Sequence, residues 1–127
     1  MNYLLTDPWF EAHFFNGARV EASKESFHSR RDDDDTPWTF AESQGVMFYC
    51  PCTFGTDAGA HMVMVVFRNP PNGIQPPPDF GPKSRDGKSH PRWDVGGSGI
   101  ADLTLSPSVD VGDSSCWHGH VKIGIIS

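Results

Sequence analysis

Residues 46–52 read VMFYCPC, a β-branched and aromatic run that ends in a pair of cysteines. The run predicts a strand, because valine and aromatic side chains favour the half-buried surface of a sheet. Residues i and i+2 of a strand face the same side, so Cys50 and Cys52 can share one metal ion. We therefore expect a sheet in which one strand leads directly into a ligand pair.

Residues 116–120, CWHGH, hold the third and last cysteine of the chain. An odd number of cysteines cannot be fully paired within one monomer, and three thiolates with one imidazole form a complete tetrahedral ligand set for zinc. We predict a structural Zn²⁺ that clips the last strand to the middle of the fold, held by Cys50, Cys52, Cys116 and His118, with His120 or His61 as substitutes for the fourth ligand. The alternative is that the cysteines are simply small buried side chains.

Catalytic interpretations of the same residues stay open. Cys116 could be a nucleophile with one of the nearby histidines as its base. Residues 116–119 also resemble half of a Rieske iron–sulfur motif with one residue missing. A small metalloenzyme would need an open coordination position, with His120 or with Asp110 and Asp113 as acid or base. Whether the chain is an enzyme is open, and the sequence favours a non-enzymatic role.

Composition favours strands and irregular loops over helices. The chain has 127 residues, of which 13 are glycine and 11 proline. We expect one mainly β domain, a small zinc-stabilised sheet or sandwich-like fold with long loops and at most a short N-terminal helix. Residues 1–127 divide into an N-terminal aromatic arm, 1–36, and a zinc-binding β core, 37–127, with a Pro-rich loop at 69–91. The expected strands are 46–50, 61–67, 92–95, 101–105 and 120–126.

Two local features are ambiguous. Asp7-Pro8 predicts the start of a short helix over residues 8–15, and Asn16-Gly17 predicts a hairpin turn as the competing interpretation. The uninterrupted apolar run at 61–67 predicts a strand that is covered on both faces. Asp32 to Asp35 could bind a divalent cation, but a solvated acidic loop is favoured because calcium loops alternate their carboxylates with other residues.

A net charge of −6 argues against a general nucleic-acid binder, which needs a basic surface to displace the counterions of phosphate. It also disfavours binding to an anionic membrane. The sequence contains no apolar run of transmembrane length and no signal-peptide pattern, so we expect a chain that is neither exported nor inserted in a membrane.

The second half of the chain resembles a family of small phage and prophage proteins of unknown function, often labelled "ammonia monooxygenase". The resemblance covers roughly residues 37–127, and the Pro-rich insertion at 69–91 departs from it. It implies a bacteriophage or prophage source, a compact β-rich fold, a zinc site, and a location in the host cytoplasm during infection or in the virion. The residues that carry it are Phe48 to Cys52, Ala60-His61, Trp93 with Gly96-Gly97, Leu103 to Val109, and Cys116 to Ile125.

With this resemblance, we expect a protein that acts by binding other proteins. The first expectation is a virion-associated component, capsid-decorating or tail-associated, that binds phage structural proteins or further copies of itself. The alternative is an intracellular inhibitor of a host defence system whose acidic residues imitate nucleic acid. Pro-rich segments lose little entropy on docking because they are already extended. The predicted partner-binding residues are Trp9, Phe10, Phe14, Pro76, Pro77 and Pro78.

Overall fold

The computed structural model describes residues 2–16, 38–55, 62–76, 78, 80–81, 83, 88–109 and 117–127. It confirms a mainly β chain, with two antiparallel sheets and no α-helix among these residues. The strands are β1 Tyr3–Leu4, β2 His13–Phe15, β3 Gly45–Tyr49, β4 Met62–Val66, β5 Asp94–Gly96, β6 Thr104–Val109, β7 Gly119–Lys122 and β8 Ile125–Ile126. Short 3₁₀ turns are η1 Pro8–Phe10, η3 Phe40–Glu42, η4 Pro51–Thr53 and η5 Ile100–Asp102.

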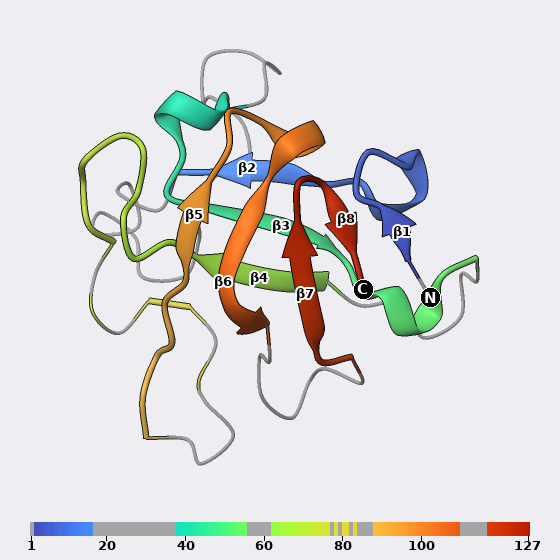
Figure 1. Ribbon diagram of the computed structural model, residues 1–127. Coiled ribbons are helices and arrows are strands. Elements are labelled where there is room, and N and C mark those ends of the chain that lie inside the picture. The colour runs from blue at the N-terminus through green and yellow to red at the C-terminus, as the bar shows by residue number, and fades with distance from the viewer. Residues whose placement is uncertain are drawn as a thin grey trace.

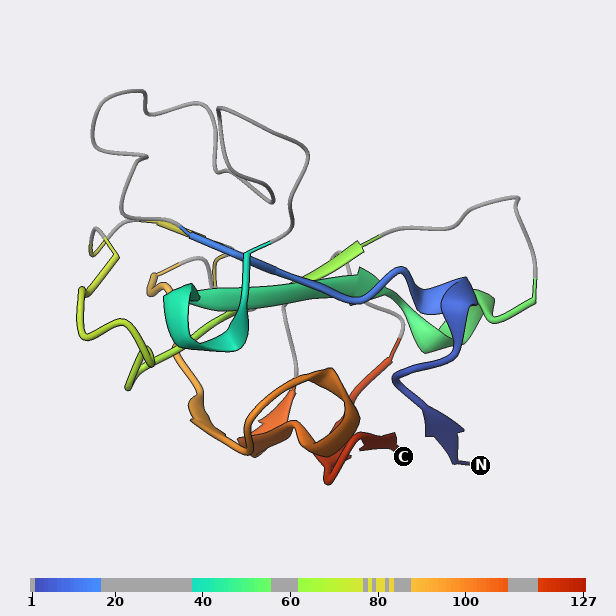
Figure 2. The same cartoon turned by 90° about the horizontal axis from the view of Figure 1, so that it is seen from above.

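The two sheets form two layers with the core between them (Figures 1 and 2). One sheet has the order β1-β8-β7-β6-β5 and the other has the order β2-β3-β4. In Figure 1 the strands of the first sheet run across those of the second, as in sandwiches whose sheets pack at a steep angle. The core takes buried side chains from both layers, among them Phe48 and Val63 from one sheet and Leu105 and Val121 from the other.

The strand that leads into the cysteine pair is confirmed, since β3 spans Gly45–Tyr49 and Cys50 follows it directly. The strand expected at 61–67 is also confirmed as β4, but the prediction that both its faces are covered is wrong. Burial alternates over Met62 to Val65, because Met62 and Met64 lie on a face of the sheet that is only partly covered.

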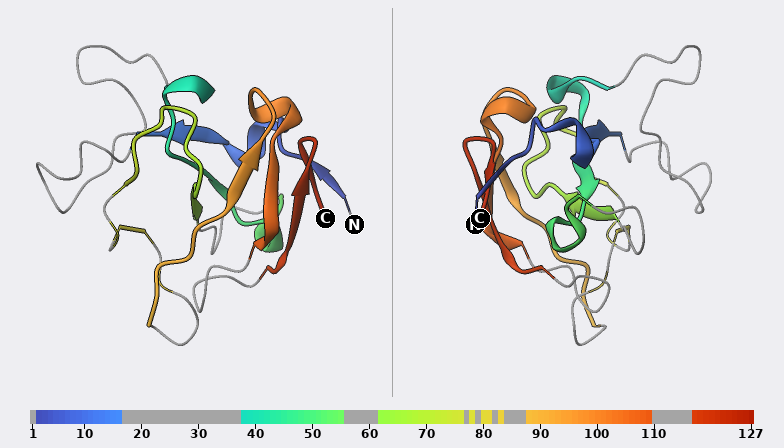
Figure 3. Two further views of the ribbon diagram at one scale, coloured as in Figure 1. Left: turned by 60° about the vertical axis from the view of Figure 1, so that its left-hand side comes forward. Right: turned by 90° about the vertical axis from the view of Figure 1, so that its right-hand side faces the viewer.

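Expectation and structure differ most at the two ends of the chain. The helix expected over 8–15 shrinks to the single 3₁₀ turn η1, capped by the Asp7 carboxylate, because the next residues pair with β3 as β2. The single strand expected at 120–126 is a hairpin of β7 and β8 instead. The N-terminal segment is also part of the core fold, since β1 joins one sheet and β2 the other, and β1 pairs with β8 beside the C-terminus (Figure 3).

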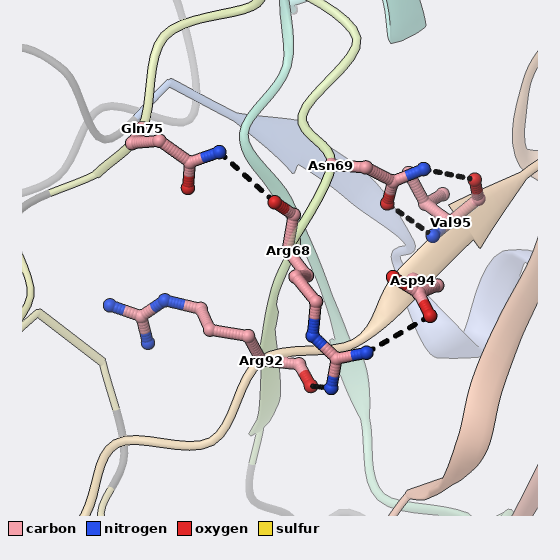
Figure 4. Close-up of polar contacts among 6 residues, drawn as sticks. All are labelled: Arg68, Asn69, Gln75, Arg92, Asp94 and Val95. Carbon is pink, nitrogen blue, oxygen red and sulfur yellow. Dashed lines mark hydrogen bonds and ion pairs between the residues drawn. The ribbon is translucent and has the colours of Figure 1, made fainter.

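A seam of polar contacts joins the two sheets where β4 ends and β5 begins (Figure 4). The Trp93 amide donates to Val66 O at 3.0 Å, and the Arg68 amide donates to Trp93 O at 2.7 Å. The Asn69 side chain bonds both backbone groups of Val95, at 2.8 and 3.1 Å. Arg68 also forms an ion pair with Asp94 at 3.0 Å. Backbone and side chains together fix the position of one layer relative to the other.

The Pro-rich loop covers part of the outer face of the three-stranded sheet. Phe15 is fully buried there and lies 5.9 Å from Phe80, measured between ring centroids. Gly45 in β3 leaves the space that the Phe15 ring occupies, since a Cβ on Gly45 would lie 2.1 Å from Phe15 Cζ. The loop therefore has a packing role in the fold.

None of the helices in the described part of the chain has the length and apolar character needed to cross a membrane.

Gly45→Ala should destabilise the protein by about 1–3 kcal/mol, because the new methyl group overlaps both the Phe15 ring and Val65 O. Gly96→Ala is the matched control in another strand, where the nearest heavy atom to the new Cβ is 3.9 Å away. Chemical denaturation of the two variants measures the difference. Equal stability would contradict the close packing of Phe15 on β3.

Asp102 organises the turn that precedes β6. Its Oδ1 accepts the Ser98 and Gly99 amides at 2.9 Å, and its Oδ2 accepts the Ser98 hydroxyl at 2.9 Å. The Ser98 hydrogen bonds lower the pKa of Asp102 below its ordinary value of 3.8. A lowered carboxyl pKa stabilises the fold above the unfolded-state pKa, and this contribution disappears as the pH falls through the folded-state pKa.

We therefore expect the acid side of the stability profile to depend on Asp102. In the wild type, Asp102 contributes stability that is lost as the pH falls from the ordinary carboxyl range toward the lowered pKa. Asp102→Asn should lack this contribution and therefore show a smaller loss of stability over the same pH range. Denaturation midpoints of wild type and variant, measured across this acid range, test the effect. Parallel curves for the two proteins would show that the turn does not respond to this proton.

Candidate functional site

The structure brings two of the predicted metal ligands together. Cys50 follows β3 at the cap position of η4, and Pro51 occupies the first position of the turn. The Sγ atoms of Cys50 and Cys52 are 3.4 Å apart. Cys50 is fully buried in the core, whereas Cys52 lies at the surface. The pair therefore has one sulfur inside the molecule and one at the surface.

This spacing is compatible with a shared metal ion. Two thiolates about 2.3 Å from a tetrahedral zinc are ~3.8 Å apart, close to the observed separation. Cys52 is disulfide-bonded in this structure. Because zinc binds thiolates and not disulfide sulfurs, Cys52 fits a metal only in the reduced protein.

The closing segment of the chain lies near this pair. The Trp117 ring contacts Phe48 edge-on with a centroid distance of 6.1 Å, and Phe48 is two residues before Cys50. The Trp117 indole also donates to Ser127 O at 3.3 Å. The strand before the first ligand pair and the segment expected to carry the second pair are therefore neighbours in the fold.

His118 has a defined partner within the described residues. Its Nε2 lies 2.9 Å from the Ser108 hydroxyl of β6. A hydroxyl at Nε2 fixes the orientation of the ring, so a metal bound by His118 would use Nδ1. Both His118 and His120 are exposed. The Ser108–His118 pair thus lies open to water, unlike a nucleophile and base enclosed in a pocket.

Several predicted site residues lie outside the described part of the chain: Cys116, His61, Asp110, Asp113, Asp32 to Asp35 and Pro77. Among the residues that are described, no three His, Cys, Asp or Glu side chains form a group that could hold a metal ion. The complete ligand set, the acidic cation site and the catalytic alternatives therefore remain predictions.

The predicted partner-binding residues divide between core and surface. Phe10 and Phe14 are core residues, 0% and 6% exposed, and Pro76 is buried too, so a partner could not reach these three in this fold. Trp9 is half-buried and lies 5.2 Å from Phe54, measured between ring centroids. Pro78 is exposed. The N-terminal aromatic residues mainly pack against the turn that carries Cys52.

The two most exposed large apolar side chains of the described residues, Leu4 and Ile123, lie elsewhere, on the β1–β8 ribbon and the adjoining hairpin. Leu4 and Ile125 are direct cross-strand partners, 61% and 40% exposed. Ile123, 70% exposed, occupies the turn between β7 and β8 with Gly124. The sequence analysis missed this surface, although Ile-Gly between two short apolar runs is a signal that could have indicated it.

Ile123 has an unfavourable backbone conformation. Its φ is 50° and that of Gly124 is 73°, the pattern of a two-residue hairpin turn that normally takes Asn-Gly. A β-branched residue with positive φ is a steric outlier. Neighbouring groups hold the turn in place, since Thr104 Oγ1 accepts the Ile123 amide at 3.0 Å and Leu103 O accepts the Gly124 amide at 2.9 Å.

Comparison with known proteins found no matching family model. It likewise found no similar curated protein and no similar solved structure. The resemblance to the phage family therefore remains a prediction from the sequence.

Proposed function

We propose that this chain is a non-enzymatic bacteriophage protein that acts by binding other proteins, as a capsid-decorating or tail-associated component of the virion. One observation supports a binding role above the others. Ile123 presents a large apolar side chain to water, at a position where local backbone energetics favour asparagine or glycine. A residue that is unfavourable for both solvation and backbone conformation is expected where a contact with a partner compensates for it.

The neighbouring residues extend this surface. Leu4 and Ile125 are adjacent on one face of the β1–β8 ribbon, and β1 is the outer strand of its sheet. An edge strand beside exposed aliphatic side chains can offer both backbone hydrogen bonds and apolar area to another protein. We name Leu4, Ile123 and Ile125 the hairpin surface and propose it as the contact region.

The proposal also includes a structural zinc in the reduced protein. Cys50 and Cys52 would supply two thiolates, and Cys116 with His118 would complete the shell. When bound, the metal would cross-link two segments of the fold and would not take part in a reaction. Such a site can contribute on the order of 10 kcal/mol to folding. This contribution is comparable to the net stability of a whole domain, about 5–15 kcal/mol.

Ile123→Asn should raise stability and weaken partner binding at the same time. Asparagine tolerates positive φ, so we expect a gain of about 1 kcal/mol in the free energy of unfolding. The loss of the apolar side chain should lower the number of copies that co-purify with phage particles. Chemical denaturation measures the first effect, and quantitative mass spectrometry of purified particles measures the second.

Ile74→Asn is the matched control for this experiment. Ile74 is also an exposed isoleucine, 53% accessible, but it lies in the loop after β4 and is not part of the hairpin surface. The Ile74→Asn variant should associate with phage particles to the same extent as the wild type. If the wild-type chain is absent from particles and present only in infected cells, the virion role is wrong and the host-defence alternative gains support.

Elemental analysis of the reduced protein should find about one zinc per chain. Cys50→Ser and Cys52→Ser should each abolish stoichiometric binding, because each removes one thiolate of the proposed set. His13→Ala is a control, since His13 lies in β2 and is not one of the proposed ligands. Zinc retained by both serine variants would exclude the cysteine pair as ligands.

A further inference from the structure

Three of the four methionines of the chain lie together on one face of the three-stranded sheet. Met47 in β3 is the direct cross-strand partner of Met64 in β4. Met62 shares the face of Met64, because residues two apart in a strand point the same way. On its other side, Met47 is opposite His13 in β2. His13, Met47 and Met64 therefore form a row across all three strands.

This row lies on the outer face of the sheet. The three methionines and His13 are half-buried, whereas the alternate positions of the same strands are buried in the core: Phe14, Val46, Phe48, Val63 and Val65. Side chains directly opposite each other in an antiparallel pair have Cβ atoms about 4.5–5.5 Å apart. The methionine side chain also has three rotatable bonds, so its sulfur can turn toward a neighbour. The thioethers and the imidazole can therefore converge on one ion that arrives from solvent.

The His13 ring is already oriented as a ligand. Its Nδ1 lies 2.7 Å from Glu11 O. A carbonyl oxygen only accepts hydrogen bonds, so Nδ1 carries the hydrogen and the lone pair of the neutral ring is on Nε2. Metal-binding histidines are typically held in this way, by a bond from the other ring nitrogen to a carbonyl or carboxylate. This hydrogen bond is independent of the methionine pairing and favours the same site.

We propose that His13, Met47, Met62 and Met64 bind a soft monovalent metal ion, Cu(I). Thioether sulfur is a soft ligand that selects Cu(I), and imidazole also suits copper, whereas magnesium and calcium prefer oxygen ligands. None of these four residues belongs to the proposed zinc site or to the hairpin surface. The inference therefore holds or fails separately from the proposed zinc and from the proposed virion role.

NMR of the metal-free full chain with ¹³C-methyl methionine and ¹⁵N-histidine tests the arrangement first. Nuclear Overhauser contacts should join the side chains of Met47 and Met64, and should join Met47 to the His13 ring. The ¹⁵N spectrum should show the hydrogen of neutral His13 on Nδ1. Missing contacts, or a hydrogen on Nε2, would overturn the proposal. This measurement needs no metal and no variant, so it decides even if a later sample does not stay folded.

Silver(I) is the metal probe, because it has the charge and closed d shell of Cu(I) and is stable in air. It is titrated into the same labelled chain in buffer without chloride. Once the cysteine thiols are saturated, one further equivalent should shift the methyl signals of Met47, Met62 and Met64 together. Met1 is the reference signal. Unmoved signals in the folded chain, or an equal shift of Met1, would show that the three methionines only pack against the sheet.

Two variants identify the ligands. His13→Ala and Met47→Leu should each abolish the saturable shift of the remaining methionines, and leucine nearly conserves the volume of methionine. His90→Ala is the matched control, since His90 Nδ1 also lies near a carbonyl, 2.9 Å from Gly81 O, but His90 precedes β5 and is outside the three-stranded sheet. It should bind silver like the wild type. Silver shifts that persist in both His13→Ala and Met47→Leu would exclude the site.

Discussion

The arrangement of the two sheets depends on Trp93. Its backbone bonds Val66 and Arg68 at the end of β4, and its indole donates to Ser108 O in β6 at 3.1 Å. Trp93 is 3% exposed and belongs to the core. One residue thus fixes the end of one sheet, a central strand of the other and the packing between them. Since buried backbone groups need partners, a shift of either layer would leave these groups without their bonds.

The N-terminal segment completes this arrangement. It supplies β1 to the five-stranded sheet and β2 to the three-stranded sheet, so residues far apart in sequence close both layers. Between these strands, η1 places Phe10 in the core and Trp9 against Phe54 in the turn after β3. The position of the cysteine pair follows, because that turn is held between the aromatic residues on one side and the core on the other.

Two of the proposed roles lie in separate parts of the molecule: zinc binding at the cysteine pair and protein contact at the hairpin surface. Sulfur atoms 3.4 Å apart can share a metal when both are reduced to thiolates. The hairpin surface is independent of that state, because it lies on β1, β8 and the adjoining turn. Its proposed role rests on a large apolar residue held at positive φ, where the local conformation alone would favour asparagine or glycine.

The sequence by itself determined the mainly β character, the strands β3 and β4, and the adjacency of Cys50 and Cys52. These depend on local propensity and on the two-residue period of a strand, both of which the sequence displays directly. Only the tertiary structure decided that Phe10 and Phe14 are buried and that Ser108 meets His118. Those features depend on which distant segments pack together, and no short stretch of sequence encodes that choice. For the same reason, only the tertiary structure shows that Thr104 and Leu103 hold the exposed Ile123 in a turn with positive φ.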